Sequence, residues 1–417
     1  MAELLLEFLR AKGFVARVLE GPGNPVIYAE ATGAHDCTLL MYGHYDVQPP
    51  EPISEWCYPP FGAVVQDGKL YGRGVSDHRG SMISRIHAVE ALMALGLLRN
   101  TVKMILEGEE EIGSPNLAET VLRHRDLLSA GACLYPGGFR GADDRPTISC
   151  GGKGVCTVRL SAKGLAGEVH SREATSVPNP AWRLIWLLAK IRGEDGQVGV
   201  PGFLRSVRQP DELDAMFISR IPPAFPYAPS SGRAQAGSTG ALVAHHLFSP
   251  TCTITRVEAG APGEGRKSAI PSRATADLEF RLVPDQDAEA VFRALMQYVA
   301  DVGYDDVEVV LLASRNPART AMTAGIVPVA VEAAKAVYGK EPILSPLFPG
   351  SGPWEVFIKG LGIPTIADTG VSYHGSSHHA PNEHVRIDDY LLGIRNIAAV
   401  LLRFDSGSRQ HTDWGGR

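Results

Sequence analysis

The sequence has no long apolar run, no basic cluster and no CxxC pair of cysteines. A helix that crosses a membrane needs roughly 18 apolar residues, and no stretch of this chain reaches that length. The net charge of -6 and the absence of a basic run argue against nucleic acid as a partner. The N-terminal segment MAELLLEFLRAKGF carries charges and reads as an amphipathic helix, which argues against a signal peptide. We therefore expect a cytoplasmic protein with no membrane partner.

The cysteines show no spacing typical of a zinc site or a disulfide framework. We expect them to be reduced and mostly buried thiols, as in cytosolic proteins. They lie at positions 37, 57, 133, 150, 156 and 252. The chain has 417 residues, of which 44% are hydrophobic and 21% charged. That composition is typical of a globular protein, and the length favours two domains over one core.

Helix-like and strand-like segments alternate in the first third of the chain and again after about residue 316. This alternation predicts a mainly parallel sheet with helices on both faces. The segments expected to be helical are 3–13, 81–96, 116–129, 327–339 and 387–404, and those expected to be strands are 25–31, 37–47, 101–111 and 364–370.

The middle of the chain has a different pattern. Segments 154–164 and 272–283 alternate apolar and polar residues with period two, which predicts half-exposed antiparallel strands. A helix-like segment, 179–193, lies between them. We therefore predict an α/β protein whose catalytic domain comprises residues 1–152 and 315–417, with an inserted α+β domain at 153–314.

Several polar residues follow apolar runs at Gly-containing turns, where a parallel sheet presents its catalytic side chains. His44 follows TLLMY, and a carboxylate two residues later, Asp46, could hold the other nitrogen of its ring. Asp77 in GRGVSDHRG could bridge two cations through its two oxygens. The alternatives are that His44 only hydrogen-bonds within a turn and that Asp77 caps the helix predicted at 81–96.

The segment LEGEEEIGS places Glu109, Glu110 and Glu111 directly after the predicted strand TVKMIL. Carboxylates this close repel one another unless one is protonated or a cation is present. In a metal site, one Glu can bind the ion while its neighbour acts as general base on a water molecule that the metal activates. A solvated charge run is the alternative, and it fits poorly after a buried strand.

Histidines are concentrated near the C-terminus, where His374, His378, His379 and His384 fall within one short segment. Clusters of imidazoles commonly indicate metal binding or proton transfer. Not all four can be ligands, and any one of them alone could be a surface residue. Together with the three acidic and histidine segments above, the cluster predicts a metal-dependent hydrolase site.

These segments resemble metallopeptidase family 20, the co-catalytic zinc hydrolases that include aminoacylase, carnosine dipeptidase, carboxypeptidase G and acetylornithine deacetylase. The resemblance runs in order over nearly the whole chain, and it is specific for the family but weak for the substrate. It is carried by GHYDVQP, WCYPPFGAVVQDGKLYGRGVSDHRG, EGEEEIGS, FRLVPDQD and HAPNE.

The resemblance implies a role for each matching residue. His44 would bind one metal, Asp77 would bridge two, Glu111 and His379 would bind the second, and Glu110 would be the general base. The inserted domain would act as a lid and join copies into a homodimer or higher homo-oligomer, with His170 polarising the scissile carbonyl of the partner's site. Substrate contacts would come from Asn179, from Arg281 as a carboxylate clamp, and from Ser351 and Gly352 in the GSGP turn.

Two positions depart from the family. His78 follows Asp77 where a second acidic residue is usual, and Pro136 stands where the first metal normally takes its third ligand. Proline offers no ligand, although a shift of the loop could bring Asp143 or Asp144 into that place. Without such a substitute, His44 and Asp77 alone are too few to hold an ion firmly. We therefore expect one firm metal site per chain.

The favoured function is hydrolysis of a C–N bond in a small carboxylate-bearing substrate, a dipeptide or an N-acyl amino acid. One alternative is deamination of an aromatic amine, as in nitroanthranilate aminohydrolase, where the substrate could complete the metal shell. The other is an inactive ligand-binding or assembly protein, which Pro136 and His78 favour and the retained Glu110, Glu111, His44 and His379 oppose. Histidine and carboxylate ligands admit zinc or manganese, with cobalt or iron also possible.

Overall fold

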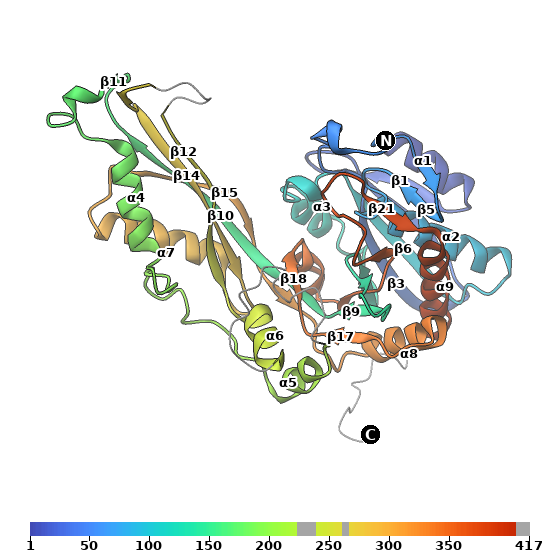
Figure 1. The fold of residues 1–417 in the computed structure, drawn as a ribbon. Helices are drawn as coiled ribbons and strands as arrows, with labels where there is room; N and C mark the ends of the chain where they lie inside the picture. Colours follow the sequence, from blue (N-terminus) through green and yellow to red (C-terminus); the bar gives the residue numbers. More distant parts are fainter. Residues whose placement is uncertain (223–238, 261–266, 406–417) are drawn as a thin grey trace. The chain divides into compact units, whose positions relative to one another are not determined.

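A computed structural model describes residues 1–222, 239–260 and 267–405 (Figure 1). Contacts between residues divide the chain into two compact units. We call residues 1–152, 210–247 and 318–417 the first unit, and residues 153–209 and 248–317 the second unit. The segment 220–240, which is rich in Pro, Ser and Gly and predicts a long loop, lies largely outside the described residues.

An 8-stranded sheet forms the centre of the first unit, in the order β1-β2-β6-β3-β7-β19-β9-β17. Strands β6, β3, β7 and β19 run parallel, and β1 and β2 add an antiparallel edge. This arrangement confirms the predicted mainly parallel sheet. The strands are Val15–Leu19 (β1), Val26–Ala31 (β2), His35–His44 (β3), Asn100–Glu107 (β6), Ala132–Tyr135 (β7), Thr147–Ser149 (β9), Ile343–Ser345 (β17) and Thr365–Ala367 (β19).

The central strands are buried on both faces because every second residue packs into a different core. On β3, Leu39 and Met41 lie in the core that includes α2 (Arg79–Ala94) and α9 (Ile387–Arg403). Leu40 and Tyr42 lie in a separate core with α3 (Leu117–Arg123) and the π-helical turn η4 (Val356–Leu361). Strands buried on both faces read as continuous apolar runs, which is why TLLMY could be recognised in the sequence.

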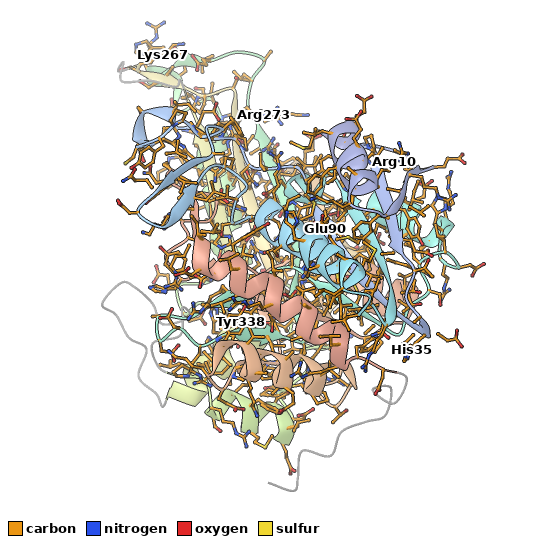
Figure 2. The ribbon with its side chains drawn as sticks, turned by 90° about the vertical axis from the view of Figure 1, so that its right-hand side faces the viewer. Arg10, His35, Glu90, Lys267, Arg273 and Tyr338 are labelled. Carbon is orange, nitrogen blue, oxygen red and sulfur yellow. The ribbon has the colours of Figure 1, made fainter. Side chains whose placement is uncertain are left out.

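Helices α2, α9 and α8 (Ile326–Tyr338) pack side by side over one face of this sheet (Figure 2). Helix α1 (Ala2–Ala11) lies beside them, and Lys12 at its end donates a hydrogen bond of 2.9 Å from Nζ to the carboxylate of Glu90 on α2. No helix among the described residues is long and apolar enough to cross a membrane.

The second unit contains an antiparallel sheet in the order β12-β14-β10-β15, covered on one face by helices. Leu160 of β10, Phe280 of β14 and Leu187 of α4 share its core. The predicted strands and helix of the middle segment are therefore present. Their bounds are Gly151–Lys163 (β10), Thr251–Ala259 (β12), Arg273–Leu282 (β14), Glu308–Arg315 (β15), Pro180–Ile191 (α4) and Ala288–Asp301 (α7).

The second unit is smaller than the segment 153–314 expected to be inserted. Residues 210–247 group with the first unit, where Phe217 of α5 (Glu212–Ser219) lies in the main core. Asp214 of the same helix is fully buried and forms an ion pair with Arg319, which anchors α5 to the first unit. The helix predicted over 116–129 is also shorter than expected, since α3 ends at Arg123.

None of the six cysteines, which all lie within the described residues, forms a disulfide, and only Cys57 is exposed. This agrees with the expectation of reduced, mostly buried thiols.

Candidate metal centre

Four segments that are distant in the sequence meet at the carboxyl edge of the parallel strands in the first unit. His44 is the last residue of β3 and is paired in register with Glu107, the last residue of the neighbouring strand β6. Glu110 and Glu111 occupy the short 3-10 turn that follows (η2, Glu110–Ile112). Because both strands run in the same direction, their ends present these side chains at one place.

Asp77 lies at the centre of the group. Its Oδ1 is 3.2 Å from Nε2 of His44, and its Oδ2 is 2.8 Å from Nε2 of His379. The same nitrogen of His379 lies 3.3 Å from Oε2 of Glu111. One carboxylate therefore contacts both histidines predicted to be ligands, as a bridging residue would. Asp77 does not cap α2, whose N-cap residue is His78 without a side-chain hydrogen bond.

The donor set fits a divalent cation. Ligand atoms of His44, Asp77 and Glu111 all lie within 4.8 Å of one another. Oε1 of Glu111 is buried and has no hydrogen-bond partner among the described residues, so an oxygen is available for a cation. Imidazole nitrogen and carboxylate oxygen suit zinc, manganese, cobalt and iron.

Neighbouring side chains hold these donors in place. Nδ1 of His44 is 3.3 Å from Oδ1 of Asp46, as expected for a carboxylate that orients a ligand imidazole. The other oxygen of Asp46 accepts a 2.9 Å hydrogen bond from the backbone N–H of Glu111. Gln48 donates from Nε2 to Oε2 of Glu111 at 2.8 Å. The segment HYDVQ thus supports both a histidine and a glutamate of the site.

Electrostatics within the group favour charged partners. Burial alone would raise the pKa of Asp77, but the nearby His378 and the hydrogen bonds from His379 and His44 hold that pKa well below its ordinary value. Hydrogen bonds to Asp77 and Glu111 raise the pKa of His379 to about 10. These shifts favour a negatively charged Asp77 balanced by a protonated His379. A bound cation would take over that role and release protons, as ligands of metals do.

The remaining histidines of the C-terminal cluster have other partners. His384 is buried, with Nε2 2.6 Å from the hydroxyl of Tyr373 and Nδ1 2.8 Å from the carbonyl oxygen of Asn382. His378 contacts Oγ of Ser76 through Nε2 at 3.1 Å, and its Nδ1 is 3.9 Å from Asp77. His374 is exposed. Among these four histidines, His379 makes the shortest contact with the carboxylates of the site.

The loop after β7 brings no acidic side chain to the group. Pro136 is buried directly after Tyr135, and Gly137 and Gly138 follow it. Asp144 accepts a 2.9 Å hydrogen bond from Arg386, and Asp143 is exposed. His78 is fully buried beside His44, with ring centroids 5.4 Å apart, and burial together with the charge on His44 lowers its pKa well below the ordinary value.

Gly352 lies next to Glu110. A Cβ atom added at Gly352 would stand 3.6 Å from Oε1 of Glu110 and 2.1 Å from the hydroxyl oxygen of Tyr135. Tyr135 is stacked on Trp354 with ring centroids 4.0 Å apart, which leaves the phenol little room to move. The GSGP turn therefore approaches the predicted general base closely, and only glycine leaves that space open.

Three predicted substrate residues belong to the second unit. His170 in β11 (Val169–His170) is exposed, and its Nδ1 accepts a hydrogen bond from the backbone N–H of Arg172. Asn179 is the N-cap of α4, with its side-chain oxygen accepting from the N–H of Ala181 at 2.9 Å. Arg281 donates from Nε to Glu279 at 2.7 Å.

The chain matches the model of Peptidase family M20/M25/M40 over residues 40–403. It is 26% identical over 313 residues to the probable di- and tripeptidase DUG2 of Saccharomyces cerevisiae, covering 72% of this chain and 34% of that protein. It is 29% identical over 289 residues to the Beta-Ala-His dipeptidase of Rattus norvegicus, covering 67% of this chain and 59% of that one. The chain thus spans less than two thirds of each of these two relatives.

Among solved structures, the M20 family metallo-carboxypeptidase Sso-CP2 from Sulfolobus solfataricus is similar over nearly the whole chain. The TM-score is 0.93 at 33% sequence identity, with 96% of this chain and 93% of that chain covered.

Proposed function

Because the chain belongs to Peptidase family M20/M25/M40, we propose that it is a metal-dependent hydrolase of C–N bonds in small substrates that carry a carboxylate, such as dipeptides or N-acyl amino acids. The observation that carries this proposal is the position of Asp77, whose two oxygens contact His44 and His379 beside Glu111. A carboxylate shared by two imidazoles supplies, together with them, the oxygen and nitrogen ligands that bind a divalent cation.

Asp77, Glu111 and His379 would hold the cation, and Asp46 would orient His44. A divalent cation bound there supplies Lewis acidity to the carbonyl and acidity to a water molecule. Glu110 accepts the proton of the attacking water molecule and returns it to the leaving nitrogen. His170 from a second copy of the chain would stabilise the negative charge that develops on the carbonyl oxygen, as the family resemblance implies.

The specificity residues are those that the family resemblance assigns. Arg281 binds the substrate carboxylate through its guanidinium group, a geometry suited to two parallel hydrogen bonds. Asn179 contacts the substrate from the start of α4. Ser351 and Gly352 line the substrate beside Glu110, where a side chain at position 352 would meet Tyr135.

Two assays applied to the same preparation test this function. Cleavage of a set of dipeptides, including β-alanyl-histidine and cysteinyl-glycine, is followed by ninhydrin, and release of ammonia from aminobenzoates is followed separately. We expect dipeptide cleavage that a chelator abolishes and that added Zn²⁺ or Mn²⁺ restores. Ammonia release without peptide cleavage would favour the aromatic aminohydrolase, and no turnover with retained ligand binding would favour an inactive homologue.

The aminohydrolase is kept as the second candidate because of Pro136. With no acidic ligand in the loop after β7, a substrate that brings its own carboxylate and amine could complete the coordination of a single cation. The last paired residues of the parallel strands β3 and β7 are Met41 and Leu134. If the same register is extended by two residues, Pro136 falls opposite Gly43, which precedes His44. By the family resemblance, position 136 is where the third ligand beside His44 and Asp77 would lie.

A Pro136→Asp variant should therefore gain a cation. We expect the wild-type protein to retain about one ion per chain after dialysis against Zn²⁺ or Mn²⁺, because His44 and Asp77 alone are too few ligands for a second. Elemental analysis should find close to two ions in Pro136→Asp. Pro136→Ala is the matched control and should stay at one, since it removes the ring without adding a carboxylate. Two ions in the wild-type protein would contradict the single-site proposal.

The second unit also carries the surface proposed to join copies of the chain. Ile185 and Trp186 lie about one turn after Trp182 on α4, and Trp182, Ile185 and Trp186 are 55%, 47% and 56% exposed. The two indole rings stack on each other at 5.7 Å. Neighbouring exposed aromatic residues of this kind are typical of interfaces.

A Trp186→Glu variant should disrupt that assembly, because a charge would be buried without a partner at the interface. Light scattering coupled to gel filtration should give an oligomer for the wild-type chain and a monomer for the variant. Leu122→Glu, on an exposed site of α3 in the first unit, is the control and should leave the mass unchanged. A wild-type monomer would contradict the proposal.

A further inference from the structure

One buried carboxylate outside the ligand set connects the two segments that carry Asp77 and His379. Glu383 is fully buried and lies at the end of the motif HAPNE that begins with His379. It immediately precedes β21 (His384–Arg386), which pairs with β5 (Lys69–Tyr71). The chain that leaves β5 therefore passes directly over Glu383 before it reaches Asp77.

Both oxygens of Glu383 accept hydrogen bonds from that passing segment. Oε1 accepts from the backbone N–H groups of Ser76 at 2.8 Å and Asp77 at 2.9 Å. Oε2 accepts from the N–H of Gly74 at 3.0 Å and from the guanidinium of Arg73 at 2.7 Å. A carboxylate with this many charge-assisted donors is tightly fixed, and it fixes them in turn.

The turn that carries His379 has an unusual backbone that needs such support. Ser377, His379 and Asn382 all have positive φ, at 56°, 58° and 62°. Positive φ is uncommon for non-glycine residues, and three such residues in one short turn favour a segment that surrounding contacts hold in place. Asn382 provides further contacts, accepting from the N–H of Cys57 at 2.6 Å and donating to the carbonyl oxygen of Glu55 at 2.9 Å.

We propose that Glu383 is a positioning residue of the metal centre, which sets the place of Asp77 relative to His379 and thereby the affinity for the cation. The carboxylate joins the backbone of one ligand to the turn of the other, so a change in its shape would move both. This inference rests on the proposed metal site. It does not depend on which substrate the protein cleaves.

The Glu383→Gln variant tests the proposal. Its amide group keeps the size of the side chain but replaces one acceptor oxygen by a donor, which would face N–H groups. We expect affinity for Zn²⁺ and Mn²⁺, measured by competition with a chromophoric chelator on apo-protein, to fall about 10- to 100-fold, as for other residues that orient ligands. If Glu383→Gln does not fold, Glu383→Asp keeps the charge and is expected to show the same loss, because its shorter side chain cannot reach all the amides.

Asp214→Asn is the matched control. Asp214 is also fully buried, accepts from a backbone N–H at 3.1 Å and pairs with Arg319, but it touches none of the candidate ligands. The Asp214→Asn variant should have a lower unfolding temperature than the wild-type protein and a metal affinity within threefold of it. A folded Glu383 variant with wild-type metal affinity would overturn the inference. Wild-type protein that binds the metal but cleaves neither dipeptides nor N-acyl amino acids would overturn the proposed function and leave the role of Glu383 standing.

Discussion

Replacing Glu110 with glutamine is expected to lower kcat by about 10²–10⁴-fold, the range that a positioned general base contributes. Glutamine fills the same space beside Gly352 but cannot accept a proton. The cation should still bind, because Glu110 does not belong to the group of His44, Asp77 and Glu111 whose ligand atoms converge. The check is steady-state kinetics on the best dipeptide, with the metal content measured on the same samples.

Glu109 offers a matched control one residue away. Its carboxylate accepts from the backbone N–H of Asn24 and from the side chain of Asn116, both at 2.9 Å, and so it holds a neighbouring loop. Glu109→Gln should reduce the free energy of unfolding and leave kcat within a few fold of wild type. Normal turnover by Glu110→Gln would show that another group takes the proton, and the proposed chemistry would fail.

The contrast between Glu109 and Glu110 also shows what the sequence could and could not reveal. Three glutamates after an apolar strand predicted a charged site, and the family resemblance separated a base from a ligand. Nothing in the local sequence indicated that Glu109 bonds with Asn24, a contact between residues 85 positions apart. Local patterns find the strand end, whereas the partner of each carboxylate depends on the tertiary fold.

The elements of the fold that the sequence predicted are those with strong periodicity. Strand β3 was recognisable because it is buried on both faces, and α9 because its apolar residues recur at helical spacing. The short strands β4 (Val64–Gln66) and β5 were not predicted, since three residues carry no usable period. Yet β5 is important to the site, because it delivers the chain to Glu383.

Segment 210–247 was assigned to the inserted domain from its place in the sequence between the two antiparallel strands. In the structure, α5 joins the first unit through buried Phe217 and the pair of Asp214 with Arg319. Between the two antiparallel strands the chain passes from the second unit into the first and back again. The amino-acid composition does not mark where it crosses. The lid role that the family resemblance implies for the inserted domain stays a prediction.

Glu383 and Gln48 were missed as supporting residues for a similar reason. Both lie inside the motifs HAPNE and GHYDVQP, in which the histidines are the residues that the sequence marks as metal ligands. Glu383 contacts residues 306 to 310 positions earlier, and Gln48 contacts Glu111. The sequence signal is an acidic residue within a segment of ligands. The structure shows that this carboxylate is buried, and a buried carboxylate requires several hydrogen-bond donors.

Asp77→Asn should remove the cation from the dialysed protein and reduce turnover below detection. Asparagine keeps one oxygen for His44 or His379 but loses the negative charge and turns the second oxygen into a donor. Only Glu111 and His379 would remain on one side and His44 on the other, and two protein ligands are too few to hold a divalent ion. Elemental analysis after dialysis and a dipeptide assay with excess Zn²⁺ or Mn²⁺ measure both effects.

Asp67→Asn is the control for the same change of charge. Asp67 is exposed in the turn between β4 and β5, with a φ of 51° that asparagine also tolerates. It should bind the metal and turn over substrate as the wild-type protein does. If Asp77→Asn retained a full complement of metal, the bridging assignment would be wrong, and the ion would have to lie elsewhere. If it lost the metal but kept its activity, hydrolysis would not need the cation. Loss of both, with the fold intact by circular dichroism, is the result that the shared contacts of Asp77 predict.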